Sequence, residues 1–450
     1  MTKAQTEGIY DARTLGKGTM LTLGLQHMVA MFGATVLVPV ITGLSMSATL
    51  LFAGLGTLIF HLCTKFKVPA FLGSSFAFLG GYATVVQMGM AGGLTQAQAL
   101  PYACIGVFCA GLIYFILAGL FAAFGPQKVM RYFPPIVTGP IIILIGLNLA
   151  SSAVDNASTC WWLALVSMVI IIVANIWGKG MIKIIPILLG VVGAYVIALI
   201  ANACGAKDAS GAALINFASL KGAKIIGLQP FITDFSGSIA KFDITAILVM
   251  APIAIASMME HIGDISAISA TVGEKFIEDP GLHRTLIGDG LATSFSALFG
   301  GPANTTYGEN TGVLVLSGVY DPKVVRLAAL YAIVLSFSPA FAALINTMPA
   351  AIIGGVSFIL YGMISAIGVR NIVENRVDFS NSRNLIIGAI ILVCGLGFTN
   401  GLPLFGGKIT LTSLAIAAIV GIVLNAILPG KDYEFGSDIS GGKSGNLGTY

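Results

Sequence analysis

Four acidic residues of this chain, Glu260, Asp264, Asp289 and Glu309, lie inside long apolar runs. Placing one charge at the centre of a bilayer costs roughly 2.5 to 3.5 kcal/mol on insertion scales. No Lys or Arg lies well inside the same runs. Acids without basic partners therefore indicate a wet cavity, a bound proton or a ligand at this place in the chain.

Glu260 and Asp264 are four residues apart in the run AIASMMEHIGDISAIS, so they share one face of a helix. Their mutual repulsion and their burial both penalise the ionised forms, which predicts a proton-binding site. The alternative is that either acid only crosslinks helices through hydrogen bonds. His27 and His261 are candidates for a proton relay or for packing, whereas Asp289, between two glycines, favours a structural role.

Glu309 belongs to the stretch GGPANTTYGENTGV at 300–313. Gly300, Gly301 and Pro302 stop the preceding apolar run, and a helix pattern resumes only from Glu309. Irregular backbone at membrane depth is tolerated only where it is buried in protein or lines a wet cavity. The stretch predicts a broken half-span with a substrate site near the midplane; the alternative is an external loop with an exposed Glu309.

Main-chain groups are expected to complete this site. Ser74, Ser75 and Phe76 in one glycine-serine break, and Tyr307 and Gly308 in the other, should expose N–H groups at positively polarised half-helix starts. A planar heterocycle with alternating C=O and N–H groups would satisfy both the amides and the carboxylates. The rings of Phe76 and Tyr307 could stack on it.

Composition defines the class of protein that positions these residues. Of 450 residues 56% are hydrophobic and 9% are charged, with a mean hydropathy of +0.94, whereas soluble domains carry about 25% charged residues. The chain is therefore a polytopic membrane protein. Its net charge of +4 is too small and dispersed for nucleic acid, and the GxxxxGK[ST] loop needed for direct ATP drive is absent from the sequence.

Apolar runs predict fourteen crossings or part-crossings, of which the third and tenth are too short for an unbroken helix. Eighteen of the 23 Lys and Arg residues fall in inside segments if the amino terminus is inside, so both termini are expected in the cytoplasm. Short similarities seven spans apart favour an inverted duplication. The runs lie at 20–41, 47–64, 73–88, 97–124, 129–153, 160–178, 181–203, 244–272, 284–299, 307–320, 324–347, 350–369, 384–398 and 409–429.

Several motifs together resemble the nucleobase/ascorbate transporter (nucleobase:cation symporter-2) family, and within it most of all the bacterial uracil permeases. The resemblance extends from about residue 17 to 430. It rests on QH at 26–27, MFGATVLVP at 31–39, LGSSFAF at 72–78, EH at 260–261, DPGL at 279–282 and NTTYGEN at 304–310.

The resemblance implies an all-α polytopic fold of fourteen transmembrane segments in two inverted repeats of seven, with short β-strands in the broken segments 3 and 10. Segments 1–4 and 8–11 would form a core domain, and segments 5–7 and 12–14 a gate domain. The implied boundaries are a cytoplasmic tail at 1–19, a first repeat at 20–203, an external loop at 204–243, a second repeat at 244–430 and a cytoplasmic tail at 431–450.

The same resemblance implies the roles of the site residues, with no metal and no cofactor other than the coupling proton. Glu260 and Glu309 would bind the pyrimidine N–H groups, and the amides of Phe76 and Gly308 its carbonyls. His27 and Tyr307 would line or support the pocket. Glu309, Glu260 and Asp264 would couple protons. The acid at 309 favours uracil, while Asp264, where uracil permeases often have His, leaves the substrate range and the proton path open.

The function expected is therefore import of uracil with protons by alternating access, in the cytoplasmic (inner) membrane. The alternatives are a purine (xanthine or uric acid) permease of the same family and an anion carrier of similar fold. An intramembrane hydrolase using Glu260, His261 and Asp264 is disfavoured, because the sequence has neither HExxH nor GxSxG with a suitable triad. The expected partners are a nucleobase, protons and lipid, with a homodimer left open.

Overall fold

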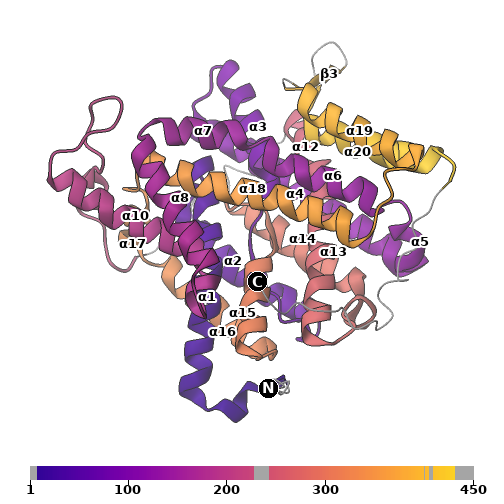
Figure 1. Cartoon of the computed structure of the whole chain (residues 1–450), viewed down its shortest axis with the longest axis horizontal. Helices are drawn as coiled ribbons and strands as arrows, with labels where there is room; N and C mark the ends of the chain where they lie inside the picture. The colour runs from indigo at the N-terminus through magenta and orange to yellow at the C-terminus, as the bar shows by residue number, and fades with distance from the viewer. Residues whose placement is uncertain (1–7, 228–242, 400, 405–408, 431–450) are drawn as a thin grey trace.

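The computed structural model describes residues 8–227, 243–399, 401–404 and 409–430, and the chain is almost entirely helical (Figure 1). The tail expected at 431–450, residues 1–7 of the other tail and residues 228–242 of the expected external loop lie outside the described residues. Seven described helices are long and apolar enough to cross a membrane, or eight if one bent pair forms a single span. The chain is thus a multi-pass membrane protein.

The first half of the chain forms ten helices, whose ends follow from local residue signals. Ser45 caps α2, Thr95 forms a capping box with Gln98 at α4, and Gly43 ends α1 in the left-handed conformation. The helices are α1 Lys17–Thr42, α2 Met46–Cys63, α3 Leu79–Ala91, α4 Gln96–Phe124, α5 Pro126–Met130, α6 Pro135–Leu147, α7 Ala150–Ser158, α8 Trp161–Ile176, α9 Met181–Ile184 and α10 Pro186–Ala203.

The second half of the chain is also mainly helical. Left-handed Gly273 and Gly318 end α13 and α15, and Asp321 caps α16. The helices are α12 Ile244–Met250, α13 Ile253–Val272, α14 Leu282–Leu298, α15 Gly308–Ser317, α16 Pro322–Ser336, α17 Pro339–Ile345, α18 Ala350–Glu374, α19 Ser382–Gly397 and α20 Ser413–Ile427. Short turns are η1 Ala12–Leu15, η2 Phe76–Phe78, η3 Phe217–Leu220 and the π-turn η5 Ile277–Gly281.

Two short strands predicted in the broken segments are present. Strand β1 (Leu72–Ser74) pairs antiparallel with β2 (Asn304–Thr306), and β1 leads through η2 into α3 while β2 leads into α15. Both strands are fully buried, so the alternative of an external loop is wrong. A second pair, β3 (Leu402–Leu404) with β4 (Ile409–Leu411), was not expected.

The helices pack in two groups. In one group α4 lies along α14, α2 contacts both α14 and α16, and α1 lies along α16. In the other group α18 contacts α6, α7 and α8, and α19 lies against α20 (Figure 1). The pair β1–β2 lies in the first group, against α2, α13 and α14.

Prolines divide two runs that were expected to be continuous. The fifth run, 129–153, is broken after α5 by Pro134 and Pro135, and α6 and α7 then form one candidate span, Pro135–Ser158. The eleventh run, 324–347, is the bent pair α16 and α17, whose axes differ by 89°. Residues that precede proline avoid the helical conformation, which explains the break before Pro339.

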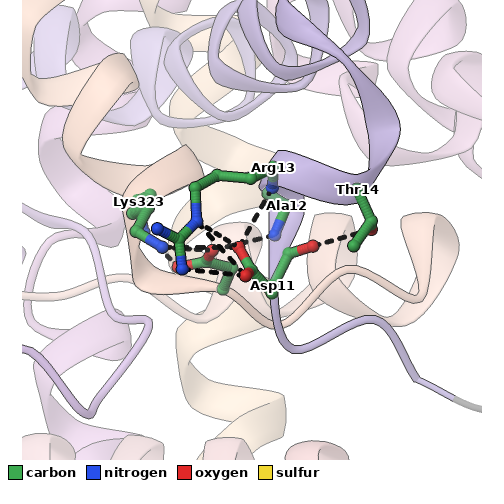
Figure 2. Close-up of polar contacts among 6 residues, drawn as sticks. Asp11, Ala12, Arg13, Thr14 and Lys323 are labelled. Atoms are coloured by element: carbon green, nitrogen blue, oxygen red, sulfur yellow. Dashed lines mark hydrogen bonds and ion pairs between the residues drawn. The ribbon is translucent and has the colours of Figure 1, made fainter.

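The described part of the amino-terminal segment, from residue 8 onward, docks on the α15–α16 junction. Ile9 N donates to Gly318 O and Tyr320 N donates to Ile9 O, both at 2.8 Å. Ala12 N donates to Asp321 Oδ2 at 2.9 Å. We call these residues, together with Asp11, Arg13 and Lys323, the amino-terminal clasp; Figure 2 shows the polar contacts around Asp11 and Lys323.

Candidate functional site

The β1–β2 ladder positions the starts of two half-helices beside each other. Ser75 N donates to Ala303 O at 2.8 Å and Tyr307 N donates to Phe71 O at 3.0 Å, which extends the ladder. These two amides, expected to be free for a ligand, are therefore engaged in the fold. Neither η2 nor α15 has a side-chain cap, so the adjacent amides of Phe76 and Gly308 remain the candidates.

Three of the sequence-predicted acids meet at this place. Glu309 lies in the first turn of α15, and Glu260 and Asp264 face it from α13. All three side chains are half-buried, and their carboxyl groups interact electrostatically with one another. A Cβ atom at the exposed Gly308 would lie 3.7 Å from Asp264 Oδ1, so this acid borders the start of α15.

The acid cluster has no basic partner. Among the described residues, no ion pair joins Glu260, Asp264 or Glu309 to a Lys or Arg. Like charges this close, partly removed from water, oppose simultaneous ionisation. The cluster can therefore take up protons, and it can accept hydrogen bonds from the N–H groups of a neutral ligand.

His27 supports the site from behind. It is fully buried in α1, and Asn310 Nδ2 donates to its backbone oxygen at 2.9 Å and lies 3.2 Å from its Nδ1. This contact fixes α15 one residue after Glu309. Asn310 was missing from the predicted site residues, although it closes the NTTYGEN motif.

Tyr307 supports the ladder rather than facing open space. Its hydroxyl donates to Ser74 O at 2.9 Å and accepts from Thr35 Oγ1 at 3.3 Å. Its ring is 4% exposed and covers Gly73, where a Cβ atom would lie 2.4 Å from the ring. The ring is thus packed between β1 and α1, and Phe76, 8% exposed, is also largely buried.

Thr306, at the end of β2, is a further contact that the sequence did not single out. Its hydroxyl donates to Asp264 Oδ2 at 2.8 Å and lies 3.4 Å from His261 Nδ1. The same nitrogen lies 3.1 Å from Asp289 Oδ2, and both side chains of this pair are fully buried. Asp289 therefore connects to the site, a position that its two flanking glycines did not reveal.

Comparisons with known proteins identify the family to which the chain is similar. The family model described as "Permease family" matches residues 18–404. A uracil permease of Bacillus caldolyticus is 40% identical over 432 residues, covering 94% of each chain, and a uracil permease of Bacillus subtilis (strain 168) is 39% identical, covering 91% of this chain and 92% of the relative.

Among solved structures, the transmembrane domain of a cyanobacterial bicarbonate transporter, BicA, matches with a TM-score of 0.57. The match covers 94% of this chain and all of that domain, at 17% sequence identity. At that identity the likeness concerns the fold alone.

Proposed function

The chain belongs to the Permease family, and on that premise we propose that it imports uracil together with protons across the cytoplasmic membrane. As a member of this family it is a transporter and not an enzyme, so the acids near His261 do not form a hydrolase centre. The relatives named as uracil permeases cover most of the chain, which supports uracil over xanthine or uric acid.

One observation carries the proposal: Glu260, Asp264 and Glu309 gather at the uncapped starts of two half-helices, and no Lys or Arg among the described residues pairs with them. Uracil has two ring N–H donors and two carbonyl acceptors. Glu260 and Glu309 accept from the N–H groups, and the amides of Phe76 and Gly308 donate to the carbonyls. A site that both accepts hydrogen bonds from N–H groups and donates them to carbonyl groups rejects ligands that lack the N–H groups or the carbonyl groups.

Proton coupling follows from the same charges. A proton on Glu309 or Glu260, with Asp264 as a third acceptor, lowers the negative charge of the site before the neutral base binds. Movement of the site to the inner side lets the base leave and the proton dissociate. A proton binds a carboxylate of the site on the outer side and dissociates on the inner side, so the proton gradient across the membrane drives the accumulation of uracil.

The architecture proposed for this cycle has fourteen segments in two inverted repeats, with both termini in the cytoplasm. The core domain comprises α1–α4 and α12–α16 with α17, and the gate domain comprises α5–α10 and α18–α20. The separate packing of α4 on α14 and of α6 on α18 supports this division. Sliding of one domain against the other would expose the acids to each side in turn.

The test is uptake of radiolabelled uracil into membrane vesicles. Uracil should accumulate under an inwardly directed proton gradient and should not accumulate once the gradient is collapsed. Competition by unlabelled uracil, xanthine, uric acid and sulfate separates the alternatives. Displacement by xanthine or sulfate but not by uracil would replace the proposed substrate with a purine or an anion.

Glu309→Gln should abolish accumulation while leaving the folded protein intact, because the amide cannot bind a proton and offers only one acceptor oxygen. Glu374→Gln is the matched control, since Glu374 pairs with Arg370 on the exposed end of α18. Unaltered uptake by Glu309→Gln, with the control also unaltered, would reject the role of Glu309.

A further inference from the structure

The pair His261–Asp289 lies behind the site and has no part in the proposed binding of uracil. Both side chains are 0% exposed, and Asp289 Oδ2 lies 3.1 Å from His261 Nδ1. Among the described residues, Asp289 has no Lys or Arg partner, and its carboxylate has no hydrogen-bond partner other than His261. We call these two residues the buried pair.

Charge balance limits the states that the buried pair can adopt. An ionised Asp289 beside a neutral His261 would leave one uncompensated charge out of water, which costs several kcal/mol. The pair avoids this by holding one proton, either as a neutral acid with a neutral imidazole or as carboxylate with imidazolium. Within the described parts of the chain, no Lys or Arg pairs with Asp289 to balance its charge. The groups that face the pair are Glu260 and Asp264 on α13, Tyr114 on α4 and the edge-on ring of Phe60 on α2.

Thr306 is the only described side chain that contacts both Asp264 and the buried pair. Its hydroxyl lies 2.8 Å from Asp264 Oδ2 and 3.4 Å from His261 Nδ1. A hydroxyl has one proton to donate. While Asp264 is ionised, the hydroxyl donates to it. In the state with imidazolium, the Thr306 oxygen can at the same time accept from His261 Nδ1–H, which also faces Asp289. When Asp264 is protonated, its own O–H donates to Thr306, the hydroxyl rotates, and the lone pair that its oxygen offers to Nδ1–H changes.

We propose that Thr306 links the protonation state of Asp264 to the buried pair, and that His261 and Asp289 are positioning residues for this acid. The proposal rests on the proposed function in one respect, the assignment of Asp264 as a proton-coupling acid. No proton crosses from Asp264 to Asp289 in this scheme. A rotation of one hydroxyl changes the hydrogen bonding of His261, so β2 and α14 sense whether the site is loaded.

The direct test is nitrogen-15 NMR of histidine-labelled protein in detergent, since the chain has only four histidines. The ring resonances of His261, assigned by their loss in His261→Asn, should shift when Asp264→Asn removes the charge. That shift should vanish in a Thr306→Val background and return with Thr306→Ser, which restores a hydroxyl. Thr285→Val is the matched control, because the buried Thr285 on α14 bonds only the backbone oxygen of Leu282.

The proposal is overturned if Asp264→Asn leaves the His261 resonances in place, or if Thr306→Val keeps the response. This readout needs no substrate, so it remains decisive even if uracil proves to be the wrong ligand. In the presence of uracil, Thr306→Val should move the pH profile of binding upward by about one unit, because an ionised Asp264 loses one hydrogen bond. An unmoved profile with intact uracil binding counts against the link but not against the transporter.

Discussion

The amino-terminal clasp and the candidate site both gather acidic side chains, but only the clasp supplies them with bases. In the clasp, Arg13 bonds Asp11 at 2.9 Å, and Lys323 lies 3.4 Å from both Asp11 and Asp321 (Figure 2). In the site, Glu260 and its neighbours have no such partner within the described parts of the chain. The clasp acids, which stabilise the fold, are paired with bases, whereas the acids of the candidate site, which are proposed to bind a ligand, are not.

Exposure makes the contrast sharper. Hydrogen bonds from Arg13 hold the pKa of Asp11 well below its usual range, so the clasp is charged at every physiological pH. Its exposed ion pairs stabilise the fold little, because water screens them. The site acids are partly removed from water, so their repulsion is stronger and is relieved only by protons or by a ligand's donors.

The largest expected effect comes from Glu260→Gln. Replacing this carboxylate removes a charge-assisted hydrogen bond worth about 1.5 to 3 kcal/mol, so uracil binding should weaken roughly ten- to hundredfold. Thermal stability should not fall, because no base is left unpaired. Binding to purified protein and a melting curve measure the two effects.

Glu278→Gln is the control for this change, since Glu278 pairs with Lys275 on the surface. A loss of stability in Glu260→Gln as large as the loss of binding would contradict the contrast, because Glu260 would then serve the fold as the clasp acids do.

Gly73→Ala should weaken uracil binding less than Glu260→Gln does, because it changes only the packing of the ladder, and it should lower the melting temperature. The new methyl group would lie 2.4 Å from the Tyr307 ring and 2.8 Å from Thr35 Oγ1, and overpacking of this kind costs about 1 to 3 kcal/mol. Gly80→Ala in α3 is the matched control, because its Cβ would meet open space. Equal melting temperatures for both variants would show that the ladder does not depend on this contact.

The clasp itself should give the smallest effect, through Asp321→Asn. The amide still caps α16 but no longer accepts from Ala12 N, so exchange of the amides of residues 9–12 should quicken roughly fivefold, corresponding to about 1 kcal/mol. Uracil binding should stay unchanged. Asp378→Asn, which alters a comparable turn at Ser380, is the control.

The pH dependence of the clasp has a defined sign. Because the pKa of Asp11 is lowered in the folded protein, its contribution is present above the ordinary Asp value and is lost as the pH falls through the lowered one. Protection of residues 9–12 should therefore be constant from about pH 8 to about pH 5. If these amides lost protection from hydrogen exchange between about pH 8 and about pH 5, a titrating group other than Asp11 would control the stability of the clasp.

The sequence predicted the acids and the breaks because each is a local signal. A candidate site can be predicted without the fold, because Glu309 lies in an apolar run and has glycines around it. The sequence could not predict which acceptor each hydrogen-bond donor meets in the folded protein. Tyr307 was a candidate to stack on a ligand or to support the pocket, and the sequence did not show that its hydroxyl bonds Ser74, 233 residues away in the chain.

The clasp and the buried pair were missed for the same reason. Ile9 and Asp11 stand in an unremarkable polar stretch, and only the fold brings them to Gly318 and Asp321. Asp289 was interpreted as structural from its flanking glycines, and its contact with His261 depends on how α13 packs against α14.

The strand β1 also constrains how the protein is made. Its partner β2 is synthesised much later, after all the helices from α3 to α14, and in lipid each unpaired backbone group costs several kcal/mol. A nascent chain that ends before Asn304 therefore carries an open strand edge inside the bilayer. Such a truncated product should be held by membrane chaperones or degraded. The interior of the first half is therefore completed only after translation has passed Thr306.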